Sequence, residues 1–332
     1  MQRGGRVLGR GALTATAVLA GILMAPATAP AALTCGKTLT KSVKLKTDLT
    51  QCPGDGLIAG ASDIRIDLNG HRITGAGLDN TEGISVSNRL HVVIKGRGGR
   101  VVGLDDGIRF SEGDRGAVRG VKVKRSSGLG IAVGSSDEVK VDGNRVIGSA
   151  AYGIEVFHSS DVEVTGNRVI GADTNVFSSA GMVVNASDSE NNLLSGNKVT
   201  PGVAGDVALW LNGGAQATKV KTNVFTGFPS YAVAVYDGAK DTLLKRNEAS
   251  GNGGNGLQVQ GGAGTGTRLI GNEASDNGGD GIEIEASGVS VGENVAEGNG
   301  GWGIVATPVV TDLGGNHASG NTLGQCSAGI AC

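Results

Sequence analysis

AAYGIEVFHSSDVEVTGNRVIG, residues 150–171, contains three short runs in which apolar residues occupy every second position. The runs GIEVF, DVEVTG and NRVIG are separated by Ser, Asp, Gly and Asn. Alternation with a period of two is typical of a β-strand with one buried face. Gly, Asn, Asp and Ser favour the tight turns between strands. The stretch therefore predicts three short strands within one unit of about 22 residues.

Close relatives of this unit recur along the chain. A four-residue motif, which we call the anchor, consists of a small residue followed by aliphatic, variable and aliphatic residues. It recurs at intervals of 22–28 residues, beginning at Gly83, Gly107, Gly130, Gly153, Gly181, Ala208, Ala232, Gly256, Gly281 and Gly303. An Asn that follows a short strand recurs in parallel with this motif, at Asn144, Asn167, Asn197, Asn223, Asn247, Asn272, Asn294 and Asn316. A repeat of this length indicates one supersecondary unit stacked many times.

The predicted fold is an all-β, single-stranded right-handed parallel β-helix, a solenoid of about eleven rungs of 22–28 residues. Leucine-rich repeats have a similar period, but they require a leucine ladder and helix-forming segments that this chain lacks. The high Gly count of 60 and the aromatic content of 3% fit many short strands joined by tight turns. The recurring Asn residues are expected to form a structural ladder, each bonding backbone groups and the amide of its neighbour.

Residues 1–32 are predicted to be a Sec signal peptide. Arg3, Arg6 and Arg10 form a basic region, and residues 12–25 form an apolar region that is too short to span a membrane. Small residues follow, so we expect cleavage between Ala27 and Ala32. No other run approaches the roughly 20 apolar residues that a membrane helix needs. The mature protein is therefore expected to be secreted, with no membrane segment.

The mature chain is weakly acidic and has cysteines only at its two ends. Without residues 1–32 it has 26 Lys and Arg against 31 Asp and Glu, a net charge of −5 before His, which argues against a nucleic-acid partner. In an exported protein four cysteines suggest disulfides. Three pairings are open, and the local pairs Cys35–Cys52 and Cys326–Cys332 need the fewest assumptions.

The repeat anchors, the segment CGKTLTKSVKLKTDLTQCPGDGLIAG and IRIDLNGHRITGAG (residues 64–77) resemble the secreted bacterial right-handed parallel β-helix proteins of the pectate-lyase-like superfamily. The resemblance spans residues 35–332. It implies an N-terminal cap at 33–61, a β-helix at 62–319 and a C-terminal cap at 320–332. It also implies a strand face that binds acidic polysaccharides. Enzymes of this fold use clustered carboxylates, often with Ca²⁺, and Arg or Lys as base.

No specific enzyme family is matched. The chain has no Gly-His-Gly of polygalacturonases and no Asp-Pro-His-Asp of alginate epimerases. Copper-handling relatives would be expected to offer more sulfur and imidazole than three Met and four His.

The variable residue of each anchor should point outward. The predicted outward column is Ser85, Arg109, Ala132, Glu155, Val183, Trp210, Ala234, Gln258, Glu283 and Val305. Glu155 and Glu283 would lie five rungs and roughly 24 Å apart. This is too far for an acid/base pair, because paired carboxyls in glycosidases lie within about 10 Å.

The best candidate site lies in the early rungs. Glu82 and Asp106 should occupy one corner on adjacent rungs, with Asp105 and Asp79 beside them and Arg109 on the adjoining strand. Such carboxylates could bind Ca²⁺ at Glu82, Asp105 and Asp106, and Asp105, Asp106 and Arg109 could serve catalysis, with Arg109 or a nearby Lys as base. The alternative is that these acids are surface residues that promote solubility.

Two further candidates lie along the same face. Glu155 and His158 could form a general acid/base pair, although an exposed strand end with a turn His is the simpler interpretation. Trp210 could stack on a sugar ring, and Tyr236 could extend that platform.

The sequence thus supports two functional hypotheses. The first is an exported protein that binds an extracellular polysaccharide or surface polymer along its strand face. The second is a polysaccharide lyase, hydrolase or epimerase acting on acidic glycans, with Ca²⁺ as its only candidate cofactor. No catalytic signature transfers residue by residue, and fold alone does not give function, which favours the first.

Overall fold

The computed structural model describes residues 1–2, 4–5, 33–171, 180–202 and 207–332. The predicted signal peptide and its cleavage site lie almost wholly outside the described residues. Within these ranges no helix is long and apolar enough to cross a membrane. From residue 33 onward the chain is one compact unit built from β-strands.

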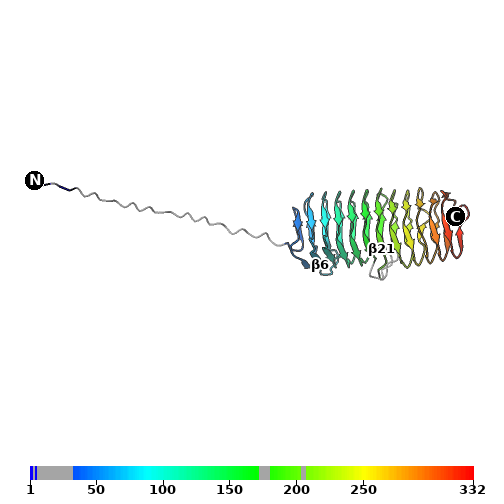
Figure 1. Cartoon of the computed structure of the whole chain (residues 1–332), viewed down its shortest axis with the longest axis horizontal. Helices are drawn as coiled ribbons and strands as arrows, with labels where there is room; N and C mark the ends of the chain where they lie inside the picture. Colours follow the sequence, from blue (N-terminus) through cyan, green and yellow to red (C-terminus); the bar gives the residue numbers. More distant parts are fainter. Residues whose placement is uncertain (3, 6–32, 172–179, 203–206) are drawn as a thin grey trace. The chain divides into compact units, whose positions relative to one another are not determined.

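Three long sheets run along this unit, and Figure 1 shows their strands stacked side by side. Sheet A contains β1 (Lys37–Leu39), β4 (Leu57–Ala59), β7 (Glu82–Ser87), β10 (Asp106–Ser111), β13 (Ile131–Gly134), β16 (Tyr152–Phe157), β19 (Ala180–Asn185), β22 (Val207–Leu211), β25 (Val233–Val235), β28 (Leu257–Val259), β30 (Ile282–Ile284), β33 (Trp302–Ala306) and β36 (Gly324–Cys326).

Sheets B and C complete each turn. Sheet B contains β2 (Val43–Lys44), β5 (Arg65–Asp67), β8 (Val93–Lys95), β11 (Ala117–Arg119), β14 (Lys140–Asp142), β17 (Glu163–Thr165), β20 (Leu193–Ser195), β23 (Lys219–Lys221), β26 (Leu243–Lys245), β29 (Arg268–Ile270), β31 (Ser290–Gly292) and β34 (Thr311–Asp312). Sheet C contains β3 (Leu49–Cys52), β6 (Arg72–Gly75), β9 (Arg100–Val102), β12 (Lys122–Lys124), β15 (Arg145–Ile147), β18 (Arg168–Ile170), β21 (Lys198–Thr200), β24 (Val224–Thr226) and β27 (Glu248–Ser250), and β32 (Val295–Glu297) pairs with β35 (His317–Ser319).

Each strand pairs in parallel with its counterpart in the next repeat, which confirms the predicted parallel β-helix. Sheet A has 13 strands, more than the eleven predicted rungs. The difference arises at the ends. The segment expected as an N-terminal cap already contains β1–β4, and β4 pairs with β7. The expected C-terminal cap likewise contributes β36, which pairs with β33.

The core consists of stacked aliphatic columns. In sheet A, Ile108, Ile131 and Ile154 lie in register on successive rungs and are almost completely buried. Burying one such side chain contributes about 1.5–3 kcal/mol relative to leaving it exposed. One rung cannot cover these residues, so the neighbouring rungs must do so.

The small residue that opens each anchor is required by the close approach of the next rung. A Cβ on Gly107 would lie 2.4 Å from the carbonyl oxygen of Gly130, and one on Gly130 would lie 2.4 Å from that of Gly153. Backbone atoms cannot move away cheaply, so a larger side chain would force adjacent rungs apart.

The predicted Asn ladder forms at the corner between sheets B and C. Asn167 donates from its backbone N and its Nδ2 to Oδ1 of Asn197, at 2.9 and 3.0 Å. Asn197 repeats this pattern toward Asn223, and its Nδ2 also donates to the carbonyl oxygen of Val164. The series runs unbroken from Asn144 to Asn316. Each amide is buried and fully hydrogen-bonded, which fixes the register of the rungs.

A second Asn ladder, which the sequence analysis did not identify, follows sheet C in the later rungs. Asn252, Asn277, Asn299 and Asn321 are buried, and each of the first three donates to Oδ1 of the next. The Asn-Gly-Gly triplets at residues 252, 277 and 299 were the available signal.

The chain ends carry the two expected local disulfides. Cys35 pairs with Cys52, and Cys326 pairs with Cys332, with Cα–Cα distances of 5.4 and 6.2 Å. No free cysteine occurs in the part of the chain that the structure describes.

We predict that Asn197→Ala lowers the free energy of unfolding by about 3 kcal/mol, because Asn167, Asn223 and the Val164 carbonyl all lose a partner in a dry interior. Urea unfolding followed by circular dichroism measures the change. Lys198→Ala, at the exposed next position, is the control and should change stability by less than about 0.5 kcal/mol. Equal effects of the two variants would show that the ladder does not stabilise the stack.

Candidate functional site

The outward column predicted from the anchors exists and lies on the outer face of sheet A. Pairing aligns Ser85 with Arg109, Arg109 with Ala132, and Ala132 with Glu155. The alignment continues through Val183, Trp210, Ala234, Gln258, Glu283 and Val305. Glu155 and Glu283 are five strands apart in this sheet, so they do not form a pair.

Arg109 organises a charged cluster at the early end of this column. Glu82 and Asp106 are register partners at the first positions of β7 and β10. The Arg109 guanidinium contacts both, through Nε to Glu82 Oε1 at 3.2 Å and through Nε to Asp106 Oδ2 at 2.7 Å. Burial acts to lower the pKa of Arg109, but the two carboxylates outweigh it and raise that pKa. The guanidinium is therefore held firmly in its charged form.

The acids beside Arg109 form a pocket of about 350 Å³ together with Asn80 and Thr81. Asp106 Oδ1 accepts the Leu129 N–H, and Asp105 accepts the backbone N–H of Asn80 and the Ser127 hydroxyl. Burial raises the pKa of Glu82, although Ser85 and Arg109 oppose the shift. Asp79 is exposed and does not line the pocket.

The calcium site expected at Glu82, Asp105 and Asp106 competes with this arrangement. The Arg109 guanidinium already supplies the positive charge between Glu82 and Asp106. Among the described residues, no group of three or more His, Cys, Asp or Glu could hold a metal ion. Calcium binding here stays an untested prediction, and we build no chemistry on it.

Glu155 lies two strands from Arg109, with only the small Ala132 between them. Burial is the main cause that raises the pKa of Glu155, and the charge of Asp106 adds to it, while Arg109 opposes it. The Glu155 carboxyl therefore keeps its proton to higher pH than an exposed Glu. Two carboxyls in different environments, Glu155 and Asp106, thus lie along one short stretch of the face.

His158 is placed with other partners. It follows β16 in a turn, where Nδ1 lies 2.5 Å from Asp188 Oδ1 and its ring contacts Phe157 edge-on. Glu155 is influenced instead by Arg109 and Asp106. The structure therefore pairs His158 with Asp188, and the expected Glu155–His158 pair is not formed. A partner 30 residues away, contributed by the neighbouring rung, carried no signal in the sequence.

Three aromatic side chains lie on or beside the column: Trp210 is in the column itself, Tyr152 opens β16, and Tyr236 follows β25. Trp210 makes edge-to-face contacts with Tyr152 and Tyr236, with ring centroids 6.1 and 6.3 Å apart. All three side chains are partly exposed, and Asn212 Nδ2 donates to the Tyr236 hydroxyl at 2.8 Å. Tyr236 and Tyr152 therefore both contact Trp210, and sugar stacking on these rings stays a prediction. Tyr152 was missed because it stands at the first position of its strand, where the chain turns and alternation does not fix the direction.

Amides and a carboxylate occupy the later end of the face. Gln258 Nε2 and Asn255 Nδ2 both donate to Glu283 Oε2 at 2.6 Å. Burial raises the pKa of Glu283, and the nearby Glu285 and Asp280 add to that effect. The outer face of sheet A thus presents, in order, a charged cluster, an aromatic group and a polar group.

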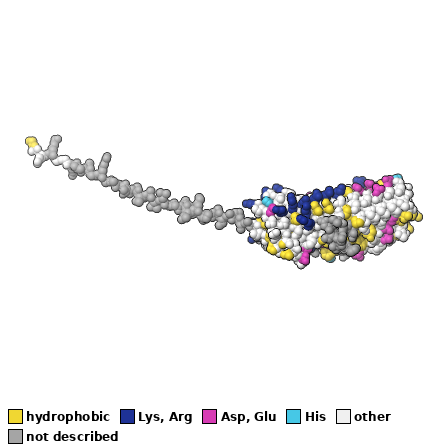
Figure 2. Space-filling view, turned by 90° about the horizontal axis from the view of Figure 1, so that it is seen from below, with side chains coloured by type: hydrophobic (Ala, Val, Ile, Leu, Met, Phe, Trp, Pro, Cys, Tyr) yellow, Lys and Arg dark blue, Asp and Glu magenta, His cyan; other side chains and the backbone are white. Residues whose placement is uncertain are grey.

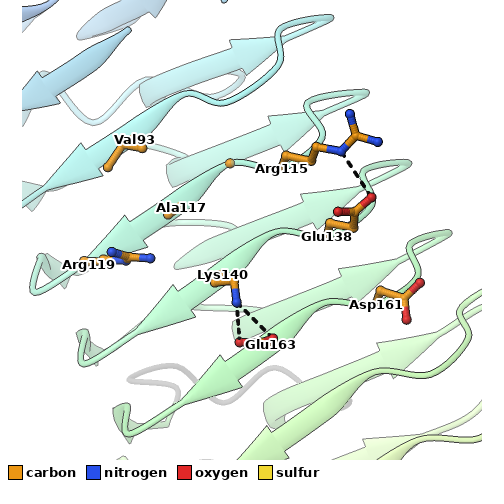
Figure 3. Close-up of a pocket in the computed structure, with 9 residues that line it drawn as sticks. Val93, Arg115, Ala117, Arg119, Glu138, Lys140, Asp161 and Glu163 are labelled. Atoms are coloured by element: carbon orange, nitrogen blue, oxygen red, sulfur yellow. Dashed lines mark hydrogen bonds and ion pairs between the residues drawn. The ribbon is translucent and has the colours of Figure 1, made fainter. Parts of the chain in front are cut away.

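A larger pocket of about 520 Å³ lies on sheet B and has a different character. Figure 3 shows Arg115 directed at Glu138 and Lys140 at Glu163. These ion pairs measure 3.2 and 2.9 Å and join neighbouring rungs. Four of the charged lining residues are matched in these two pairs, whereas Arg119 and Asp161 line the pocket without an ion pair among the described residues.

Comparison with known proteins identifies the family. The family profile described as "Periplasmic copper-binding protein (NosD)" matches residues 47–231, more than half of the chain. The chain belongs to the NosD family. A profile for the right-handed β-helix region matches residues 173–332, which agrees with the handedness predicted from the sequence. No curated protein matches the chain in sequence.

Solved structures similar to this NosD-family chain share its fold at low identity. The periplasmic alginate epimerase AlgG aligns with a TM-score of 0.66 and 15% identity, covering 87% of this chain and 73% of that one. PfbA, a surface adhesin of Streptococcus pneumoniae, aligns with a TM-score of 0.60 and 10% identity, covering 84% and 83%. The A-module of the Azotobacter vinelandii mannuronan C-5 epimerase AlgE4 aligns with a TM-score of 0.56 and 14% identity, covering 88% and 91%.

The copper in the family's description can be tested against the donors of this chain. Copper is bound by imidazole, thiolate and thioether groups. Here the four cysteines form disulfides, and Met182 is buried in the core. Each histidine faces its own carboxylate on a different turn: His71–Asp48, His91–Asp63, His158–Asp188 and His317–Glu297. The described residues therefore do not fit a copper centre built from such donors.

We predict that Glu155→Gln makes the protein more stable than the wild type at pH 7 and that this gain disappears as the pH falls toward 4. The folded-state pKa of Glu155 is raised, so the folded wild type bears the cost of ionising a half-buried carboxyl above that pKa. Below the ordinary Glu pKa of about 4.3 the carboxyl is protonated in both states and the cost vanishes. Thermal unfolding at several pH values measures the difference.

The exposed Glu112→Gln makes the same chemical change and serves as control. A stability difference for Glu155→Gln that stays constant across this pH range, or that grows as pH falls, would contradict the assignment of Glu155 as a carboxyl with a raised pKa.

Proposed function

We propose that this protein is an exported glycan-binding protein that holds a polysaccharide along the outer face of sheet A. The observation that carries the proposal is the aromatic group Tyr152–Trp210–Tyr236, whose Trp210 stands in the same outward column as Arg109. Exposed aromatic side chains are unusual in a chain with 3% aromatic residues. Their position on one face, beside charged and amide groups, matches the surface that an extended glycan requires.

The face is long enough for several sugar units. From Arg109 on β10 to Tyr236 after β25 the sheet advances five strands, or roughly 24 Å. Aromatic faces pack against the C–H surfaces of sugar rings and bury apolar area without losing much side-chain entropy. The Arg109 guanidinium can donate to ring substituents or to a uronate carboxylate.

Three buried acceptors on or beside this face have no protein donor among the described residues: Glu82 Oε2, Asn212 Oδ1 and Gln258 Oε1. Buried polar atoms usually find a partner, in the protein or in ordered water or ligand. Sugar hydroxyls are donors of the right kind. The three atoms lie at the charged end, the aromatic middle and the polar end of the face.

A second candidate function is a polysaccharide lyase, hydrolase or epimerase. The specific observation that favours it is the difference between the environments of Glu155 and Asp106, since such differences separate acids from bases in active sites. Two features oppose it. Both oxygens of Asp106 are already hydrogen-bonded, to Leu129 N–H and to Arg109. Arg109 itself cannot act as a base without losing a proton that its two carboxylates stabilise.

Two observations support export of the protein. The family profile describes a periplasmic protein, and two disulfides fit an oxidising compartment. We include export, through the N-terminal leader predicted from sequence, in the proposal.

We predict that Trp210→Leu weakens binding to the best ligand on an array of neutral and acidic glycans by about tenfold, because the flat ring that contacts the sugar is lost. Trp210→Phe keeps a ring and should stay within about threefold of the wild type. Calorimetry with the selected oligosaccharide measures both. No binding to any array glycan, or equal binding by the two variants, would contradict the proposal.

Incubation of the same glycans with wild-type protein, followed by detection of unsaturated uronides and new reducing ends, separates binding from catalysis. The binding function predicts no release. Release that is abolished by Asp106→Ala in a folded variant would establish the enzymatic alternative.

A further inference from the structure

Sheet C carries a basic side chain at the same position of six successive strands. Register pairing aligns them at the first position of each strand from β6 to β21. These residues are Arg72, Arg100, Lys122, Arg145, Arg168 and Lys198. We call this row the basic column. It lies on a different sheet from the aromatic group, so it was not part of the site described above.

The basic column faces solvent. Five of its six residues are exposed, and Lys122 is half-exposed. Arg72 pairs with Asp48 at 2.8 Å, whereas the next five have no ion pair with any acid among the described residues. Figure 2 looks at the side on which Figure 1 labels β6 and β21, and it shows Lys and Arg side chains gathered in a band there.

This arrangement is unfavourable for the isolated protein. Like charges directly opposite each other on neighbouring strands repel. The pKa of Lys122 is lowered, chiefly by the charge of Lys124, with burial, Arg145 and Arg100 contributing further. On the sheet B side some neighbouring rungs instead pair opposite charges, as Arg115–Glu138 and Lys140–Glu163 do, although Lys95 and Arg119 are like-charged register partners there. The basic column thus lacks the compensation that the same fold provides elsewhere.

Small apolar and hydroxyl side chains run beside the column. The third positions of β9, β15, β18 and β21 are Val102, Ile147, Ile170 and Thr200, all half-exposed, whereas β12 carries Lys124 at this position. No aromatic side chain occupies either outward position of these strands. The strip therefore offers a line of positive charge with a narrow, mostly apolar edge.

We infer that the outer face of sheet C binds a linear acidic polysaccharide, whose carboxylates meet the basic column while its sugar C–H groups lie against the apolar edge. Strand spacing sets the positive charges about 4.8 Å apart along a straight line. From Arg100 to Lys198 the column advances four strands, or roughly 19 Å. A polyuronate is an extended chain with one carboxylate on each sugar, and it can match several of these charges at once.

Nucleic acids fit the strip less well. Single strands are bound by stacking of bases on aromatic side chains, which the strip lacks. A duplex backbone winds away from a straight row that is one side chain wide, and its charges lie about 3.4 Å apart along each strand. The whole chain also has a net charge of −2, so the basic column is a local feature of an acidic protein.

The experiment compares the wild type with three variants. Arg145→Gln/Arg168→Gln removes two central charges of the column. Arg65→Gln/Arg268→Gln removes two exposed charges from first strand positions of sheet B and is the matched control. Trp210→Leu tests the face of sheet A. The probes are defined-length oligomers of polygalacturonate and polymannuronate, the methyl ester of the polygalacturonate oligomer, and a single-stranded DNA of equal charge. Affinity is measured at 50 mM and 200 mM salt. Circular dichroism checks that each variant is folded.

We expect the wild type to bind at least one polyuronate, to lose affinity with added salt, and to ignore the methyl ester. The Arg145→Gln/Arg168→Gln variant should bind at least about tenfold more weakly, and the Arg65→Gln/Arg268→Gln control should stay within about twofold of the wild type.

Absence of polyuronate binding by the wild type, unchanged binding by Arg145→Gln/Arg168→Gln, or binding of the DNA as tight as that of the polyuronate would each overturn the inference. Loss of binding only in Trp210→Leu would also overturn it and would place the polymer on sheet A. The glycan-binding function proposed for sheet A is tested separately, because neutral glycans on the array do not depend on the basic column.

Discussion

The hydrogen bonds from each buried Asn to the next rung are the interaction on which the rest of the structure depends. Oδ1 of Asn197 accepts two N–H groups from Asn167, and Nδ2 of Asn197 donates onward to Asn223. A slip of one residue would leave these amides unpaired in the interior and would turn every inward aliphatic outward. Because the register is fixed in this way, each outward position becomes a straight column along the molecule.

Both proposed surfaces follow from that constraint. On sheet A the columns place Arg109, Glu155 and Trp210 in one line, so groups from different repeats act together. On sheet C they place in line five basic residues that have no ion pair among the described residues. Repetition alone does not specify chemistry, however. On sheet B the same geometry pairs Lys140 with Glu163, so that these two charges compensate each other. Function therefore depends on which side chains occupy the outward positions.

The sequence predicted the strands, the Asn167 ladder and the outward column, because all of these repeat with a fixed period. It predicted the local disulfides because the cysteines occur only at the two ends of the mature chain. It did not predict the contacts of residues outside the period. Tyr152 stands at a corner, and His158 bonds Asp188 across a rung that is lengthened by several residues. The role of Arg109 as a clamp between Glu82 and Asp106 also needed coordinates, because residue type alone fits a base equally well.

Trp210 is one of only two tryptophans, so its emission can report directly on the central claim that a glycan lies on sheet A. In a Trp302→Phe variant Trp210 is the sole tryptophan. Titration of this variant with the best array glycan should shift or quench the emission, with a midpoint equal to the affinity from calorimetry. Calorimetric binding without any change in Trp210 emission would contradict the account.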